Sequence, residues 1–277
     1  MGNHITVLRY LQPFGIEIDI DLSRELQPEL AAELRELFYT QKLIVARNQS
    51  LSLEQQAQVM SIFGPVMRTY DSMGYLTTDE TANTTANVVP TAELKFHADY
   101  EYTDWGALGL SLHAIDVVDG ATSTRFADAI AACTDMPSDL LTVFDHAQIR
   151  MSSGFDAEII KRFPDATPYA GYHPAISLHP ETGQRYLRAS EMQTEEIVGF
   201  PPEESAKWLS RLHEWMLRPE NIVEHFWYKG DFLMWDNRAT HHARSALRGI
   251  GRRHLQRVGI GLKPSTESDP TFHRLFA

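Results

Sequence analysis

The stretch FLMWDNRATHHARSALRGIGRRHLQRVGIG, residues 232–261, sets adjacent histidines and a cluster of arginines between two strand-like runs. The first run continues an alternating pattern that begins at residue 221 and turns at residues 229–231, which predicts a β-hairpin. The second run, RRHLQRVGIGL, predicts a further strand. His241 and His242 between them either belong to a basic, solvated hairpin or are held there for chemistry.

A second polar pair lies in KFHADYEYTDW, residues 95–105, where one residue separates His97 from Asp99. Side chains alternate along a strand, so positions 97 and 99 point the same way, roughly 7 Å apart, and one metal ion could bind both. Two imidazoles and one carboxylate on one face of a metal are typical of non-haem Fe(II) oxygenases. One of the adjacent histidines would complete such a set. The alternative interpretation is a surface strand that carries two polar residues by chance.

The composition argues against several classes of partner. Acidic residues outnumber basic ones by 37 to 25, for a net charge of −12, and nucleic acids and anionic membranes are bound through Lys and Arg. No apolar run approaches the roughly 18 residues that span a bilayer, and residues 1–10 lack a secretory signal. A single cysteine, Cys133, excludes an intrachain disulfide and suits a reducing compartment. We expect a cytoplasmic protein with a small-molecule substrate, and leave open a homodimer or homotetramer.

The order of elements predicts one domain over residues 1–277, mainly β with flanking helices, because no repeat or linker interrupts the chain. Leucines at helical spacing predict a helix over 27–41 that leads into a buried strand. Ser52 and Gln55 form the capping box of a second helix. Further helices are expected within 126–133, 137–147 and 201–217, a hairpin over 175–188, one or two strands over 106–120, and an irregular insertion over 155–172.

The stretch from about residue 71 to 96 is polar, rich in small residues and without helical or strand periodicity. We expect mainly loop there. A loop of this length inside a compact domain is usually functional or disordered. Because it ends directly at His97, it is predicted to form a lid near the candidate metal site.

Five motifs, FHAD, DGATSTRFADA, HPETGQRYL, GDFLMWDNRATHHA and RRHLQRVGIG, occur in the order seen in the taurine dioxygenase-like (TauD/TfdA) family of Fe(II)/2-oxoglutarate-dependent dioxygenases. The chain resembles that family from about residue 5 to 265. The resemblance implies an α+β protein built on a double-stranded β-helix, or jelly roll, whose mouth holds iron on a His-x-Asp...His triad. The matching residues are His97, Asp99 and His242, the last at the eighth position of WDNRATHH. His241 is left to pack or to line the rim of the site, where it is a candidate substrate contact.

The resemblance also implies a site for 2-oxoglutarate. Thr124 in TSTRFAD and Arg253 in GRRHLQR resemble the residues that bind its distal carboxylate, and a guanidinium offers the planar fork that a carboxylate needs. The family's usual GGDT reads GATST here, so the glycine-aspartate part is missing while the threonine is kept. Arg257 matches the family's second arginine, which serves a substrate anion, the cofactor site or the fold.

Taurine is not expected as the substrate. Where taurine dioxygenase holds the sulfonate with a histidine and an asparagine, this chain has Thr69 and Glu93, which become candidate contacts for another substrate. The implied reaction uses O2 and 2-oxoglutarate to oxidise, most often hydroxylate, a small organic molecule with release of succinate and CO2. Two other functions stay open: a zinc-dependent hydrolase or lyase on the same three ligands, and a non-catalytic jelly-roll binding protein.

Overall fold

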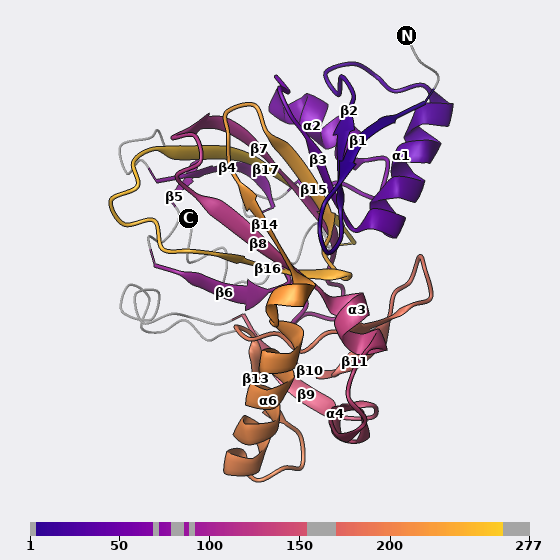
Figure 1. The fold of residues 1–277 in the computed structure, drawn as a ribbon, viewed down its shortest axis with the longest axis vertical. Coiled ribbons are helices and arrows are strands. Elements are labelled where there is room, and N and C mark those ends of the chain that lie inside the picture. The colour runs from indigo at the N-terminus through magenta and orange to yellow at the C-terminus, as the bar shows by residue number, and fades with distance from the viewer. Residues whose placement is uncertain (1–3, 69–71, 79–85, 89–91, 154–169, 263–277) are drawn as a thin grey trace.

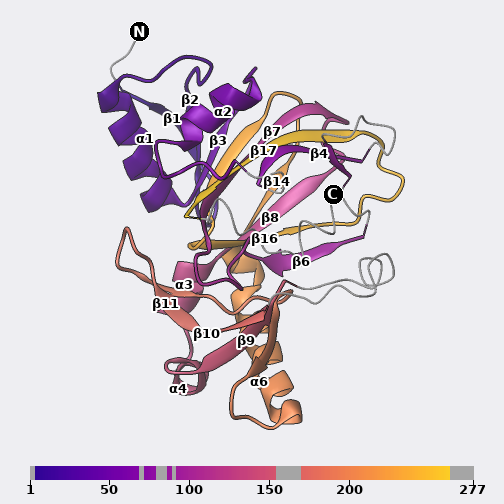
Figure 2. The ribbon, with the colours of Figure 1, turned by 180° about the vertical axis from the view of Figure 1, so that it is seen from behind.

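The computed structural model of the chain describes residues 4–68, 72–78, 86–88, 92–153 and 170–262. Two large β-sheets dominate it, and helices lie outside and below them (Figures 1 and 2). The predicted class, mainly β with flanking helices, is confirmed. Among the described residues, no helix is both long and apolar enough to cross a membrane.

The larger sheet has eight strands in the order β1-β2-β3-β15-β7-β17-β4-β5, with antiparallel neighbours except β2–β3 and β4–β5. Its strands are β1 (Thr6–Tyr10), β2 (Ile16–Asp19), β3 (Leu43–Ala46), β4 (Met73–Thr77), β5 (Ala86–Val88), β7 (Ala107–Val117), β15 (Phe232–Asp236) and β17 (Arg253–Gly261). Central β15 is buried along its whole length, because one face packs under the helices and the other faces the second sheet.

The smaller sheet is antiparallel and has the order β14-β8-β16-β6. Its strands are β6 (Leu94–His97), β8 (Ser123–Asp128), β14 (Ile222–Phe226) and β16 (Thr240–Arg244). A three-stranded sheet and a two-stranded sheet lie below it with α3, α4 and α6 in Figure 1. These contain β9 (Gln148–Ser152), β10 (Ala170–Pro174), β11 (Ile176–Leu178), β12 (Arg185–Leu187), β13 (Thr194–Ile197), α3 (Ala129–Thr134), α4 (Ser138–Phe144), α6 (Pro202–Met216) and the 3-10 turn η1 (Pro219–Asn221).

Helices α1 (Pro28–Gln41) and α2 (Leu53–Met60) cover the outer face of the larger sheet and confirm the two helices predicted first. Phe38 of α1 is fully buried and stacks on Phe63 with ring centroids 4.2 Å apart. The capping box of α2 is formed as expected, since Ser52 Oγ accepts from Gln55 N and Gln55 Oε1 accepts from Ser52 N. A second hydrophobic core fills the space between the two sheets and supports the candidate site.

The hairpin predicted from the alternating pattern at 221–237 is wrong. β14 pairs with β8 in the smaller sheet, whereas β15 pairs with β3 and β7 in the larger one, so the chain crosses between sheets at the predicted turn. Alternation marks a strand with two different faces but does not specify its neighbour. Asp231 anchors the crossing, because its carboxylate accepts from Tyr228 N at 2.9 Å and also contacts Arg47 and His225.

The segment 71–96 is not mainly loop, because it carries β4, β5 and the start of the site strand β6. β4 gains its order from pairing with β17, a partner that the local sequence does not reveal. Residues 71, 79–85 and 89–91 lie outside the described residues, and the lid remains a prediction.

Three other predicted elements can be compared with the structure. The hairpin at 175–188 is confirmed by the pairing of β11 with β12. The helix expected within 126–133 begins only at Ala129, where Asp128 caps it through Ile130 N and Ala131 N. Of the expected insertion, residues 170–172 form part of β10 and the remainder lies outside the described residues.

Candidate active site

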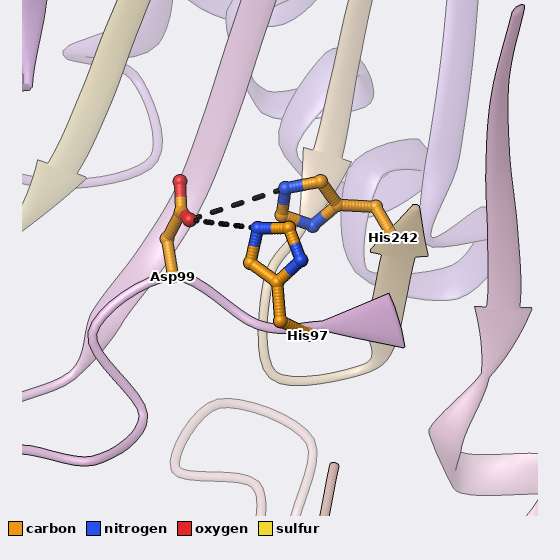
Figure 3. Close-up of side chains that lie close together, drawn as sticks. All are labelled: His97, Asp99 and His242. Carbon is orange, nitrogen blue, oxygen red and sulfur yellow. Dashed lines mark ion pairs between the residues drawn. The ribbon is translucent and has the colours of Figure 1, made fainter. Parts of the chain in front are cut away.

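The two imidazoles of the candidate site come from adjacent strands of the smaller sheet. β16 and β6 are antiparallel neighbours, and their register sets His242 opposite His97. Side chains of residues opposite each other in a sheet lie on the same face. The two rings therefore approach each other, with centroids 4.3 Å apart (Figure 3).

Asp99 joins the histidines from beyond the end of a strand. β6 ends at His97, so the two residues are not in one continuous strand as the alternation argument assumed. Asn237 holds Asp99 in place, because its Oδ1 accepts from Asp99 N and its Nδ2 donates to Asp99 O, both at 2.9 Å. The next residue, Tyr100, has a left-handed φ of 61° and turns the chain away from the site.

One carboxylate oxygen faces both histidines. Asp99 Oδ1 lies 3.4 Å from His97 Nε2 and 4.0 Å from His242 Nε2, and both dashed lines in Figure 3 end on it. These distances exceed an ordinary N–H···O hydrogen bond. The ligand atoms of the three residues all lie within 4.8 Å of one another. Two imidazole nitrogens and a carboxylate oxygen that converge in this way fit a transition metal such as Fe(II).

The electrostatics favour the protonation states that a metal needs. His97 Nδ1 lies 2.7 Å from Lys95 O, which directs its N–H there and leaves Nε2 as a lone pair toward Asp99. Burial, reinforced by nearby His97, holds the pKa of His242 well below its usual value, so its imidazole is neutral. Burial alone would raise the pKa of Asp99, but the Arg257 guanidinium, His97 and His242 hold it well below its ordinary value. Asp99 is therefore ionised, which is the state that a metal ligand needs.

Thr124 and Arg253, the two residues expected to bind 2-oxoglutarate, are both buried. Thr124 is buried on β8, and its Oγ1 accepts a hydrogen bond from Trp227 Nε1 at 2.9 Å. Arg253 begins β17 with only 4% of its surface exposed, and its Nε has no hydrogen-bond partner among the described residues. Burial and the nearby charge of Arg244 lower the pKa of Arg253 to about 9, so it remains a cation at neutral pH.

A buried cation of this kind fits an anionic ligand. Within the described part of the chain, no carboxylate forms an ion pair with Arg253. Leaving a guanidinium buried without a counter-charge is costly, and a carboxylate bound in bidentate fashion relieves that cost. The residues present therefore suit the distal carboxylate of 2-oxoglutarate.

Of the four residues predicted as candidate substrate contacts, the three that the structure describes do not form one cluster around the candidate metal site. Arg257 donates from Nη2 to Asp99 Oδ2, so it helps to hold the carboxylate of the candidate site. Glu93 is exposed and pairs with Arg125 at 3.4 Å. Thr69 lies outside the described residues. His241 is buried, faces the opposite side of β16 from its neighbour, and has its pKa lowered to about 3 by burial and by the nearby histidines at 213 and 97.

Sequence reasoning missed the residues that hold the loop after Asp99. Glu101 is buried, and its Oε2 lies 3.2 Å from Arg188 Nε and accepts a hydrogen bond from the Tyr186 hydroxyl at 3.2 Å. Arg188 also donates to the carbonyl oxygens of Glu101 and Thr103. Asn237 lies within the WDN motif that sequence analysis singled out, but its partner is 138 residues away. No local signal could have linked the two.

Comparison with known proteins agrees with this geometry. A family model described as "Taurine catabolism dioxygenase TauD, TfdA family" matches residues 8–258. A (S)-phenoxypropionate/alpha-ketoglutarate-dioxygenase from Sphingobium herbicidovorans is 27% identical over 242 residues, which cover 82% of this chain and 84% of the relative. An alpha-ketoglutarate-dependent 2,4-dichlorophenoxyacetate dioxygenase from Cupriavidus pinatubonensis is 25% identical, with coverage of 88% and 92%.

The fold is shared with solved structures. A taurine dioxygenase from Burkholderia xenovorans superimposes with a TM-score of 0.76 at 24% identity, covering 93% of this chain and 90% of that one. This likeness confirms the predicted jelly roll with flanking helices.

We predict that Asn237→Ala weakens Mn(II) binding by about tenfold or more, because residues that orient a ligand contribute roughly that much to metal affinity. Mn(II) serves as a redox-stable probe, and its binding is measured by titration of the purified protein. The matched control is Asn221→Ala, which also removes a buried asparagine that donates to two carbonyl oxygens, those of Asp128 and Met216. Both variants should lose about 1–3 kcal/mol of unfolding free energy. Equal Mn(II) affinity in the two variants would show that Asn237 does not position Asp99.

Proposed function

Because this chain belongs to the TauD/TfdA family, we propose that His97, Asp99 and His242 hold its Fe(II). Thr124 and Arg253 bind the distal carboxylate of its co-substrate, 2-oxoglutarate. The chain is an Fe(II)- and 2-oxoglutarate-dependent dioxygenase, which oxidises a small organic substrate and releases succinate and CO2. The observation that carries the assignment of residues is the convergence of three ligand atoms within 4.8 Å of one another.

The protein's part in the reaction is to position the metal, the co-substrate and the substrate. When bound, the metal and its co-substrate supply the oxidising chemistry, in which one atom of O2 enters succinate and the other enters the substrate. Arg257 engages Asp99 Oδ2, so Oδ1 is the oxygen that faces both imidazoles. Arg253 offers the charge, and Thr124 a directional hydroxyl, for a carboxylate.

Two aromatic side chains pack beside the His242 ring. The Trp235 ring lies 5.1 Å from the His242 ring, and Phe126 lies 6.4 Å from it. Both aromatic residues are buried. They exclude water from one side of the ligand set, which keeps His242 neutral and protects a reactive intermediate from side reactions.

The relatives favour the dioxygenase over the other two functions. Those described above are named as alpha-ketoglutarate-dependent enzymes, not as zinc hydrolases, lyases or binding proteins. A zinc hydrolase on the same ligands would also leave Arg253 buried without a role.

We further propose that the primary substrate is a small organic anion. The two relatives act, by their names, on (S)-phenoxypropionate and 2,4-dichlorophenoxyacetate, which are carboxylates. Arg257 is the candidate contact, because it places a positive charge beside Asp99. The single cysteine, Cys133, supports a cytoplasmic location, and the net charge of −12 argues against nucleic acids and anionic membranes as partners. One catalytic domain is supported by a site that draws β6 and β16 from one sheet and β17 from the other.

The function is tested by omitting one component at a time. Succinate should form from 2-oxoglutarate only when Fe(II), O2 and the protein are present together, and compounds that accelerate its formation identify substrates. The measurement is succinate by mass spectrometry after anaerobic loading with metal. Full turnover in EDTA, or with Zn(II) in place of Fe(II), would contradict the proposal.

Replacing Arg253 by Gln is expected to weaken 2-oxoglutarate binding by about 1.5–3 kcal/mol, which is roughly tenfold or more, because a charge-assisted contact is lost. Metal affinity should remain unchanged. The matched control is the adjacent Arg252→Gln, since Arg252 is exposed and pairs with Asp116 at 3.1 Å. Dissociation constants are measured by calorimetry with the metal-loaded protein. If both variants bind 2-oxoglutarate like wild type, another residue is the anchor.

Iron content of two variants distinguishes the roles of the adjacent histidines. His242→Ala should purify without stoichiometric iron, because one of three ligands is gone. His241→Ala should retain iron, since its imidazole points to the opposite face of β16. Iron is quantified in folded, anaerobically reconstituted protein. The reverse pattern, with iron kept by His242→Ala and lost by His241→Ala, would move the triad by one position.

A further inference from the structure

The indole of Trp227 is fully buried and makes a single polar contact that bears on the co-substrate pocket. Its Nε1 lies 2.9 Å from Thr124 Oγ1. An indole N–H can only donate, so the threonine hydroxyl is the acceptor in this contact. A hydroxyl that accepts in this way still has one hydrogen to donate. Among the described residues, no acceptor for that hydrogen is found.

The indole itself is held from several sides. Trp227 N donates to Thr122 O at 2.9 Å, and the ring packs edge-on against His225 with centroids 5.0 Å apart. His225 Nε2 in turn lies 2.9 Å from Asp231 Oδ2, the carboxylate that anchors the crossing between the sheets. The donor therefore has a fixed position and direction, which is what preorganisation requires.

The hydroxyl lies next to the buried arginines. Residue 225 is paired with Thr124 across β14 and β8, so its side chain stands beside the hydroxyl on the same face. On the other side, β16 pairs with β8 up to Ala243 opposite Arg125, and Arg244 is the next residue along that strand. Arg244 is close enough to Arg253 to lower its pKa. The strand pairing therefore places Thr124 beside Arg244, whose charge acts on the buried Arg253.

We propose that Trp227 is a positioning residue for 2-oxoglutarate. Its N–H occupies one lone pair of Thr124 Oγ1 and thereby directs the hydroxyl hydrogen toward the distal carboxylate. Arg253 supplies the positive charge that attracts the carboxylate, and the Trp227–Thr124 pair supplies a hydroxyl hydrogen with a fixed direction. This inference rests on the proposed function, because it requires 2-oxoglutarate to be the anion of the Arg253 pocket.

A double-mutant cycle tests the inference by calorimetric 2-oxoglutarate binding to anaerobic, Fe(II)-loaded protein. Trp227→Phe removes the N–H and keeps an aromatic ring, whereas Thr124→Val removes the hydroxyl and keeps the branched shape. Each should weaken binding by about fivefold or more, the usual effect of one hydrogen bond. The double variant should bind no more weakly than Thr124→Val alone, because the indole acts only through the hydroxyl. Mn(II) affinity should be the same in all four proteins.

The control is Trp215→Phe, which also removes an indole hydrogen bond, from Nε1 to Ala132 O at 2.9 Å, on helix α6. It should bind 2-oxoglutarate like wild type. If Trp227→Phe binds like wild type, or if the two substitutions add fully in the double variant, Trp227 is only a packing residue and the inference is overturned. Failure of the wild-type protein to bind 2-oxoglutarate at all would instead overturn the proposed function.

A second substitution covers the case in which Trp227→Phe does not fold. Replacing Trp227 by 3-benzothienylalanine keeps the size and shape of the indole and exchanges its N–H for sulfur. The inference expects the same weakening of 2-oxoglutarate binding, with cooperative thermal unfolding retained and only slightly lowered by the lost hydrogen bond. Wild-type affinity in this variant would overturn it, because only the hydrogen-bond donor has been removed.

Discussion

The register between β16 and β6 is the contact on which the site depends, because it sets His242 opposite His97. A shift of one residue in either strand would send one imidazole to the other face of the sheet. β16 is protected against such a shift by its second neighbour, since it also pairs with β8 from Thr240 to Ala243. The irregularity in its pairing with β6 comes only beyond His242 and leaves the two ligands in register.

The carboxylate of the site depends on contacts of a different kind. Asp99 lies past the end of its strand, and its position comes from side chains far along the chain, Asn237 at a separation of 138 residues and Arg257 at 158. The loop that follows is held through Arg188, which donates to backbone carbonyls 85 and 87 residues away. Buried hydrogen bonds therefore hold this loop in place of a sheet ladder.

Burial between the sheets acts on two basic groups with opposite consequences. It lowers the pKa of both His242 and Arg253. The usual pKa of a histidine lies near neutral pH, so the lowered pKa leaves His242 uncharged, as a candidate metal ligand must be. Arg253, even with its pKa lowered to about 9, stays a cation whose charge a bound anion would balance. The interior between the sheets therefore offers an imidazole lone pair for a metal and a guanidinium charge for a carboxylate, the two contacts that metal-bound 2-oxoglutarate would need.

The sequence by itself determined the types of residue available for chemistry, the helices with leucine periodicity and capping box, and the strands β3, β7, β14, β15 and β17. These features are local, because side-chain alternation and caps involve residues a few positions apart. Only the tertiary structure decided that β14 and β15 belong to different sheets, that residues 73–77 form a strand, and that Asn237 holds Asp99. Each of these depends on which distant segment supplies the partner for a backbone or side-chain group. A local pattern can show that a strand has an apolar face, but only the packed molecule settles what lies against it.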